Sequence, residues 1–184
     1  MKTTIQWKFL GLVDGNIQSV HGDCTWNIGK WQKPILGIEM YTRGYHSSPG
    51  IVEAYRWVNG TILAQVECKG KHIDGATKSV WESMRITKAW MWTNEAHVAL
   101  VRRCIEIHLK RYPDDNWGKK ALIDLNDGYP VLFSYWDSDS DAGMLDVYLY
   151  HHRTNSDYYV SFRACDVNKW LAEDILPTLE EVKG

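Results

Sequence analysis

The sequence has little phenylalanine, little proline and no long hydrophobic run. Among 184 residues there are three Phe and five Pro, against ten Trp and ten Tyr. No stretch of 18 apolar residues occurs, so the sequence predicts no membrane-spanning helix. Residues 1–12 lack the hydrophobic core of a signal peptide. We therefore expect a soluble protein that is not exported and has no membrane partner.

Several motifs of catalytic and metal sites are also missing. There is no G-x-S-x-G, no P-loop, no G-x-G-x-x-G and no H-E-x-x-H motif. Their absence disfavours the enzyme classes that use these motifs. The four cysteines, Cys24, Cys68, Cys104 and Cys165, stand singly without a C-x-x-C pair. Reduced thiols are the simplest interpretation, although their even number leaves disulfides open. We expect no metal site.

The charge balance is close to neutral. Lys and Arg number 21 against 23 Asp and Glu, a net charge of -2. This balance disfavours nucleic acid as a partner, because no overall field attracts a phosphate backbone. With 45% hydrophobic and 24% charged residues the composition is that of a globular protein. Trp and Tyr carry polar groups on large apolar rings, which suits interfaces and half-wet grooves as well as cores.

Short alternating runs predict a strand-rich first half. A hairpin is expected over residues 7–21, with its turn at 14–16, and Pro49 begins a short helix over 49–58. Strands are expected over 61–68 and 78–92.

The alternation also predicts which side chains share a face of these two strands. Ile62, Ala64, Val66 and Cys68 share one face of the first strand. On the second strand, Val80, Glu82, Met84 and Ile86 share one face and Trp81 lies on the other. Glu82 is thereby placed among apolar neighbours.

The second half begins with a long helix over 94–111, whose apolar stripe contains Val98, Val101, Ile105 and Leu109. A three-stranded antiparallel meander follows over 131–136, 145–151 and 158–163, and Asp166 caps a C-terminal helix. The fold class is therefore α+β. We expect two regions, residues 1–92 and 93–184, which can pack into one unit.

Two apparent metal motifs fail on chemistry. The alternating acids of 137–141 resemble a calcium loop, but Ala142 and Tyr148 stand where Gly and a bidentate Glu are required. A solvated acidic turn is the better interpretation. His151 and His152 are adjacent on a strand, so their side chains point to opposite faces and do not share a metal.

Residues 7–92 resemble a domain of unknown function that is frequent in bacteriophage and prophage proteins. The matching residues are Lys8-Phe9-Leu10, His21-Gly22, Trp26, Gly29-Lys30-Trp31, Gly44-Tyr45-His46, Ala54, Trp57, residues 63–67 and Gly70. That domain commonly carries a Cys before its Gly-Tyr/Phe-His, where this chain has Tyr41 and Thr42. The resemblance implies a phage origin and a location in the cytoplasm of an infected bacterial host.

The same region also resembles the core of ADP-ribosyltransferases. His21-Gly22 is followed by Gly44-Tyr45-His46-Ser47-Ser48, a short helix and further strands, in the order of that family. The resemblance implies that His21 and Tyr45 position NAD and that a Glu stabilises the oxocarbenium-like transition state. Glu82 is the best candidate by position and Glu67 the second.

The sequence supports three hypotheses. The first is a non-enzymatic, phage-encoded accessory protein that binds a host factor or a nucleotide-like small molecule and counters host defence. Its ligand groove would be formed by His21, Trp26, Trp31, Tyr45 and His46.

The second hypothesis is an NAD-dependent ADP-ribosyltransferase or NAD hydrolase, with His21, Tyr45 and Glu82 as catalytic residues. Whether the protein is an enzyme is left open, with binding favoured. The third is a virion or dimerisation component whose meander tyrosines, Tyr148, Tyr150, Tyr158 and Tyr159, pack against a partner chain. A homodimer is left open.

Overall fold

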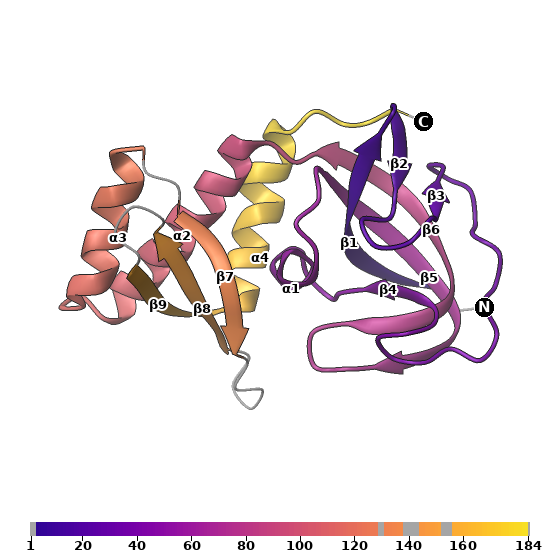
Figure 1. Ribbon diagram of the computed structural model, residues 1–184, viewed down its shortest axis with the longest axis horizontal. Helices are drawn as coiled ribbons and strands as arrows, with labels where there is room; N and C mark the ends of the chain where they lie inside the picture. The colour runs from indigo at the N-terminus through magenta and orange to yellow at the C-terminus, as the bar shows by residue number, and fades with distance from the viewer. Residues whose placement is uncertain (1–2, 129–130, 138–143, 152–155, 184) are drawn as a thin grey trace. The chain divides into compact units, whose positions relative to one another are not determined.

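The computed structural model describes residues 3–128, 131–137, 144–151 and 156–183. The chain forms two units: unit 1 comprises Met1–Trp92 and Leu176–Gly184, and unit 2 comprises Thr93–Ile175. Both units contain strands and helices, so the α+β class is confirmed (Figure 1). The segment Leu176–Gly184, which the sequence division placed in the second region, belongs to unit 1.

A six-stranded antiparallel sheet forms unit 1, in the order β3-β2-β1-β5-β6-β4. Its elements are β1 (Thr4–Val13), β2 (Asn16–Gln18), β3 (Thr25–Trp26), β4 (Tyr45–Ser47), α1 (Ile51–Trp57), β5 (Ile62–Asp74) and β6 (Ser79–Met91). The hairpin turn lies where the sequence predicts it, since Asp14 and Gly15 both have positive φ, of 49° and 77°. Helix α1 begins after Pro49 rather than at it, with Gly50 as the N-cap.

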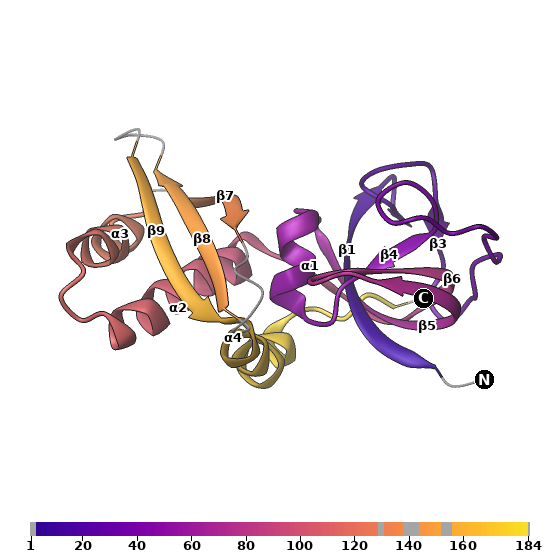
Figure 2. The same ribbon diagram turned by 90° about the horizontal axis from the view of Figure 1, so that it is seen from below.

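The sheet curls until its ends meet. Beyond β4, Ser48 exchanges two backbone hydrogen bonds of 2.8 Å with Trp7 of β1. On the other side, the chain after β3 joins β6, because the Gly29 N–H donates to the Ile86 carbonyl at 2.8 Å. Unit 1 is therefore a small curled barrel rather than an open sheet (Figure 2).

The barrel interior is one apolar cluster. It contains Leu10, Ile17, Trp26, Ile62, Ala64, Val66, Cys68, Trp81, Met84, Ile86 and Ala89. The four residues that alternation assigned to one face of β5 are all in it, which confirms that prediction. On the opposite side of β1, the Phe9 ring packs edge-on against Tyr55 of α1 at 5.1 Å and Trp92 at 5.3 Å.

Strand β6 does not keep a period of two. Its pairing with β5 shifts register between Gln65 and Val66 and again between Lys69 and His72. As a result, Trp81 lies in the core together with Met84 and Ile86, so the prediction that placed Trp81 on the opposite face is wrong. A bulge cannot be read from alternation, because one extra residue reverses the faces beyond it.

In unit 2, α2 (Asn94–Arg111) has the bounds that the sequence predicts. The Thr93 hydroxyl caps it by accepting from the Ala96 N–H at 3.2 Å. Its buried stripe is Ala96, Leu100, Val101, Cys104, Ile105 and His108, rotated from the predicted one. A second helix, α3 (Asn116–Asn126), was not predicted. Gly118 near its start lowers the helix propensity of the segment.

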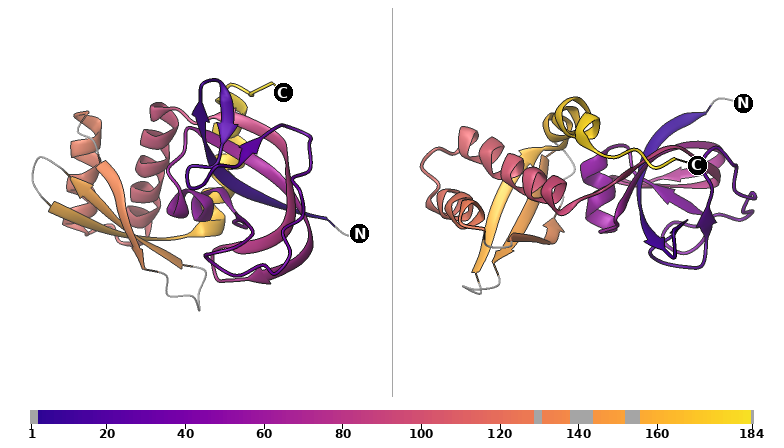
Figure 3. Two further views of the ribbon diagram at one scale, coloured as in Figure 1. Left: turned by 45° about the vertical axis from the view of Figure 1, so that its right-hand side comes forward. Right: turned by 90° about the horizontal axis from the view of Figure 1, so that it is seen from above.

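Strands β7 (Val131–Asp137), β8 (Met144–His151) and β9 (Ser156–Arg163) form an antiparallel meander in the order β7-β8-β9. Figure 3 shows α2 and α3 on the same side of this sheet, and both helices contact β7 and β9. The tyrosine positions of the meander lie in strands, with Tyr148 opposite Tyr159. Most of the acidic turn, residues 138–143, and His152 lie outside the described residues.

The C-terminal helix begins earlier than predicted. Helix α4 (Ala164–Trp170) has Arg163 as its N-cap, so Asp166 lies in its first turn, and a π-helical turn follows over Leu171–Ile175. The chain then pairs with the end of β6: the Met91 N–H donates to Glu180 and the Val182 N–H to Ala89, each at 2.9 Å. None of the described helices is both long and apolar enough to cross a membrane.

Candidate functional site

Unit 1 contains a cavity of about 300 Å³ beside β1, which lines it with Trp7, Lys8 and Phe9. Three elements, β1, β4 and α1, supply its walls, and the connecting segments after β2, before β4 and before β6 close its sides. Its polar residues are Lys8, Lys78, His21, His46, Ser19, Ser47 and Ser48, and its aromatic residues are Trp7, Phe9, Tyr41 and Trp57. Among the described residues that line it there is no Asp or Glu.

Lys8 brings a half-buried ammonium group to this cavity from β1. Its Nζ donates to the backbone oxygen of His46 at 2.8 Å and lies 5.8 Å from the centroid of the Trp26 ring. Burial lowers the pKa of Lys8 to about 8, and nearby Lys78 acts in the same direction. The amine is therefore charged at neutral pH, but less firmly than a surface lysine.

Lys78 supplies a second cation. Its Nζ lies 3.7 Å from the ring centroid of Trp57 and 4.0 Å from that of Tyr41. Burial lowers its pKa, with a further contribution from Arg56. The two rings are exposed, Tyr41 by 67% and Trp57 by 36%. They form an aromatic edge to the cavity that a flat ligand can contact.

His46 holds the loop that carries Tyr41. Its Nε2 accepts from the Tyr41 backbone N–H at 3.1 Å, and Tyr41 adopts a positive φ of 73° there. Burial lowers the pKa of His46 to about 4, and the positive charges of Lys78 and Lys8 act in the same direction. His46 is therefore neutral at physiological pH and positions the cavity wall rather than carrying a charge to a ligand.

The structure separates the other residues that the sequence grouped with His21 and His46. His21 lines the cavity together with His46. Trp26 is 3% exposed in the barrel core, its Nε1 donates to Ser19 Oγ at 3.0 Å, and its ring meets Tyr45 edge-on at 5.6 Å. The Tyr45 hydroxyl donates to the Lys33 carbonyl at 2.8 Å. Trp26 and Tyr45 are not among the lining residues: the Trp26 ring lies beside Lys8 Nζ, and Tyr45 packs against Trp26.

Trp31 belongs to a different surface. The Lys69 Nζ lies 3.8 Å from its ring centroid, and the Arg85 guanidinium lies 4.9 Å from it. Arg85 is held in turn by Glu67, whose Oε2 accepts from Nε at 2.6 Å. A hydrogen bond from Thr3 and those from Arg85 hold the pKa of Glu67 below its usual value. Glu67, the second candidate for catalysis, is thus one half of an ion pair.

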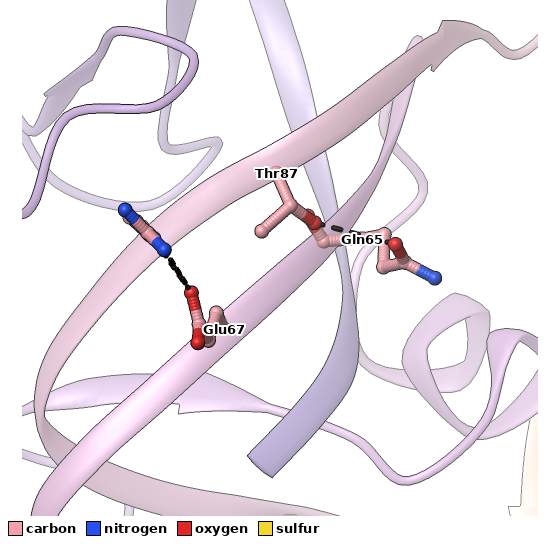
Figure 4. A network of polar contacts seen from close by, with 4 residues as sticks. Gln65, Glu67 and Thr87 are labelled. Carbon is pink, nitrogen blue, oxygen red and sulfur yellow. Dashed lines mark hydrogen bonds and ion pairs between the residues drawn. The ribbon is translucent and has the colours of Figure 1, made fainter. Parts of the chain in front are cut away.

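Figure 4 shows the same polar face of β5 and β6 from close by, with Glu67 paired to a guanidinium. Next to it, the Thr87 hydroxyl donates to the Gln65 carbonyl at 3.1 Å. These contacts join neighbouring strands across the register shift. They stabilise the sheet and leave no carboxylate there without a partner among the described residues.

Glu82 fastens the second β5–β6 bulge. Its Oε2 accepts from the Lys71 backbone N–H at 2.9 Å, and its side chain lies over Gly70, whose φ is +90°. A Cβ at Gly70 would lie 2.7 Å from that oxygen. The bulge and its cap therefore need Gly and Glu together. Glu82 does not line the cavity with His21, so the structure does not bring the three proposed catalytic residues together.

Comparisons with protein families, curated proteins and solved structures found no match for this chain. The resemblances to a phage domain and to ADP-ribosyltransferases therefore stay predictions. What the cavity binds has to be inferred from the residues that line it.

Sequence reasoning missed Lys8, Lys78, Tyr41 and Trp57 as site residues. Lys8 had a usable signal, because a single Lys between Trp7 and Phe9 on an apolar strand needs a reason to be there. Tyr41 lies outside the predicted strands, and Lys78 lies at the very start of the strand predicted over 78–92, just before β6 begins, so no period marks either residue as part of a site. In the described part of the chain, no group of three or more His, Cys, Asp or Glu side chains is placed to hold a metal ion.

Proposed function

We propose that unit 1 binds a nucleotide-like small molecule, an organic anion with a flat ring, in the cavity between Lys8 and Lys78. The observation that carries the proposal is the lining itself: two ammonium groups, two exposed aromatic rings and no carboxylate among the described residues. Besides burial, the charge of Lys78 lowers the pKa of Lys8, so the two cations repel each other in the empty site, and an anion between them relieves that repulsion.

The size of the cavity narrows the ligand. A volume of about 300 Å³ is at the lower end of ligand pockets. It suits one nucleotide better than a dinucleotide, so we expect ADP to bind at least as well as NAD. The phosphates would contact Lys8 and Lys78, and the base would stack against Trp57 and Tyr41.

We propose binding without bond cleavage. ADP-ribosyl transfer requires a carboxylate close to the ribose, whereas Glu82 caps a bulge through the Lys71 N–H. The phage accessory role, the host cytoplasm as its location and a host protein as an alternative partner rest on the resemblance of residues 7–92 and remain part of this proposal. In that role the protein would sequester or sense a nucleotide of the host.

The test is calorimetric titration of the full chain with ADP, NAD, adenosine and inorganic phosphate. We expect Lys78→Met and Trp57→Ala each to weaken ADP binding by about tenfold or more, since a hydrogen bond to a charged group and a stacked base contribute roughly 1–3 kcal/mol each. Lys88→Met removes an exposed lysine of the same barrel and Trp31→Ala removes a Trp outside the cavity, so they are the matched controls.

Equal losses in the cavity variants and in their controls would overturn the site. Failure of ADP, NAD and phosphate alike to bind the unaltered chain would overturn the proposal for a small anionic ligand. Mass spectrometry of the NAD sample after incubation tests for enzymatic activity. Release of nicotinamide would contradict binding without cleavage.

A further inference from the structure

The amine of Lys8, which lines the cavity, can act as a nucleophile as well as form an ion pair. Among the described residues, the His46 carbonyl is the one hydrogen-bond acceptor of Lys8 Nζ, at 2.8 Å. An ammonium group has three N–H donors, so the other two are available to the cavity that Lys8 lines. No carboxylate of the described lining residues neutralises the charge. Such a setting favours the neutral, nucleophilic amine.

We propose that Lys8 is a covalent capture site for a phosphorylated aldehyde, with Lys8 Nζ as the attacking atom and Lys78 as the cation that holds the phosphate. The inference rests on the proposed function, because the cavity must first bind the anion. Lys78 lines the same cavity, and holding the phosphate there places the carbonyl beside Lys8 at a high effective concentration.

The reaction is a condensation without an oxidant or reductant. Lys8 first releases one proton to solvent, and the lone pair of its Nζ then forms a bond to the aldehyde carbon. One of the two protons on nitrogen passes to the carbonyl oxygen, which becomes the hydroxyl of a neutral carbinolamine. That hydroxyl takes a proton from solvent and leaves as water, and the second proton on nitrogen returns to solvent, which leaves a neutral imine. Protonation of the imine gives an N–H.

The surroundings of Lys8 favour both the free amine that reacts and the protonated imine that forms. The protonated imine keeps one N–H, which can donate to the His46 carbonyl as the amine does now. Burial lowers the pKa of Lys8 to about 8, with the charge of Lys78 acting in the same direction, while the thiols of Cys24 and Cys68 act against it. At neutral pH about a tenth of such an amine is unprotonated, roughly two orders of magnitude more than for a surface lysine.

The experiment uses pyridoxal 5′-phosphate as the probe, with the full chain. The imine is reduced with borohydride, and the labelled lysine is identified by peptide mapping. We expect Lys8 to react at least about tenfold faster than exposed lysines, with half-maximal labelling near pH 8. Pyridoxal without the phosphate should label Lys8 about tenfold less, because it lacks the group that Lys78 would hold.

Three variants make the result specific. Lys8→Met should abolish the selective label, and Lys78→Met should slow it. Lys88→Met, which removes an exposed lysine of β6, should leave it unchanged. Even labelling over all lysines, labelling of Lys78 in place of Lys8, or equal reaction with pyridoxal would overturn the inference.

A competition arm separates this inference from the proposed function. ADP that binds the chain and blocks labelling of Lys8 supports both. If ADP binds but pyridoxal 5′-phosphate does not label Lys8 even in the absence of ADP, covalent capture is overturned and nucleotide binding is left in place. Selective labelling of Lys8 in a chain that does not bind ADP overturns the nucleotide proposal and supports Lys8 as the reactive amine.

Discussion

The two units of this chain carry opposite charge. Unit 1 has 12 Lys and Arg against 9 Asp and Glu, a net of +3, whereas unit 2 has 9 against 14, a net of -5. Seven of the ten Trp also belong to unit 1. The net charge of -2 hides this difference, because it describes the whole chain and not the charge of each unit.

The charged side chains of the two units also have different surroundings. In unit 1, Lys8 and Lys78 face a cavity without an acidic partner among its described lining residues. In unit 2, the acid Asp115 caps α3 through the Gly118 N–H at 2.7 Å and contacts buried His108 at 3.1 Å. We infer that charge serves ligand binding in unit 1 and helix packing in unit 2.

The largest expected effect is on the barrel of unit 1. At Gly44, φ is +127° and a Cβ would lie 2.4 Å from Val80 Cγ2. Gly44→Ala should therefore lower the free energy of unfolding by about 3 kcal/mol or more. Gly37→Ala, at a φ of +65° but with its nearest neighbour at 3.8 Å, should cost only about 1 kcal/mol. Urea unfolding measures both, and equal costs would contradict the close approach at Gly44.

The next effect is on unit 2. Asp115→Ala should lower its free energy of unfolding by about 2–3 kcal/mol, because α3 loses its cap and His108 loses a buried partner. Asp114→Ala, at the exposed neighbouring position, is the control. ADP affinity should be unchanged in both variants if binding belongs to unit 1 alone. A loss of ADP binding in Asp115→Ala would refute that separation.

The charge of Asp115 also gives unit 2 a pH dependence. Burial raises the pKa of this carboxyl, but hydrogen bonds from Gly118, His108 and Trp117 outweigh burial, so the folded pKa lies below the usual value. The contribution to stability is therefore present above the unfolded pKa and is lost as pH falls through the folded one. Thermal melts from pH 6 down to about 3 should show a loss that is smaller in Asp115→Asn.

Unit 1 should respond to pH in the opposite range. Because the pKa of Lys8 is about 8, raising the pH removes its charge. ADP affinity should fall about tenfold between pH 7 and pH 9, if only the ammonium form binds. Titration at several pH values measures the fall, and Lys8→Met should remove it. An affinity that stays constant up to pH 9 would show that Lys8 does not contact the ligand.

The smallest effect is expected at Glu82. Glu82→Gln keeps an acceptor for the Lys71 N–H, so stability should change by less than about 1 kcal/mol and ADP affinity not at all. Glu82→Ala should cost more stability, since the bulge loses its cap. Unfolding curves and ADP binding assays on both variants measure these changes in stability and affinity. A large loss of a measured NAD-cleaving activity in Glu82→Gln would return Glu82 to the catalytic role first inferred from the sequence.

Regular elements were predictable from the sequence, and irregular ones were not. The face of β5 with Ile62 and Val66 and the bounds of α2 follow from periods of 2 and 3.6, which the backbone imposes. Helix α3, which was not predicted, contains Gly118. A Cβ there would be 2.9 Å from Leu109 Cδ2, so packing against α2 requires the glycine that propensity disfavours. The N-cap Asp115 was the signal that could have located this helix.

The candidate site was predicted only in part, for the same reason. His21 and His46 reach the cavity, whereas Trp31 lies over Lys69 and Arg85, and Glu82 lies at the bulge. Sequence proximity grouped Trp26 with Trp31, but the chain after β3 runs along β6 and carries Trp31 away. Tertiary contacts of loops decide such placements, and no local pattern encodes them.

The pairing of the C-terminal segment with β6 has a consequence for the order of folding. Residues 89–91 of β6 hold the backbone of Glu180 and Val182, and Val182 packs against the barrel core. All of unit 2 is synthesised between these two partners. During synthesis, all residues of unit 2 therefore leave the ribosome before the last residues of unit 1 do. Unit 1 starts first but is the later of the two units to be completed.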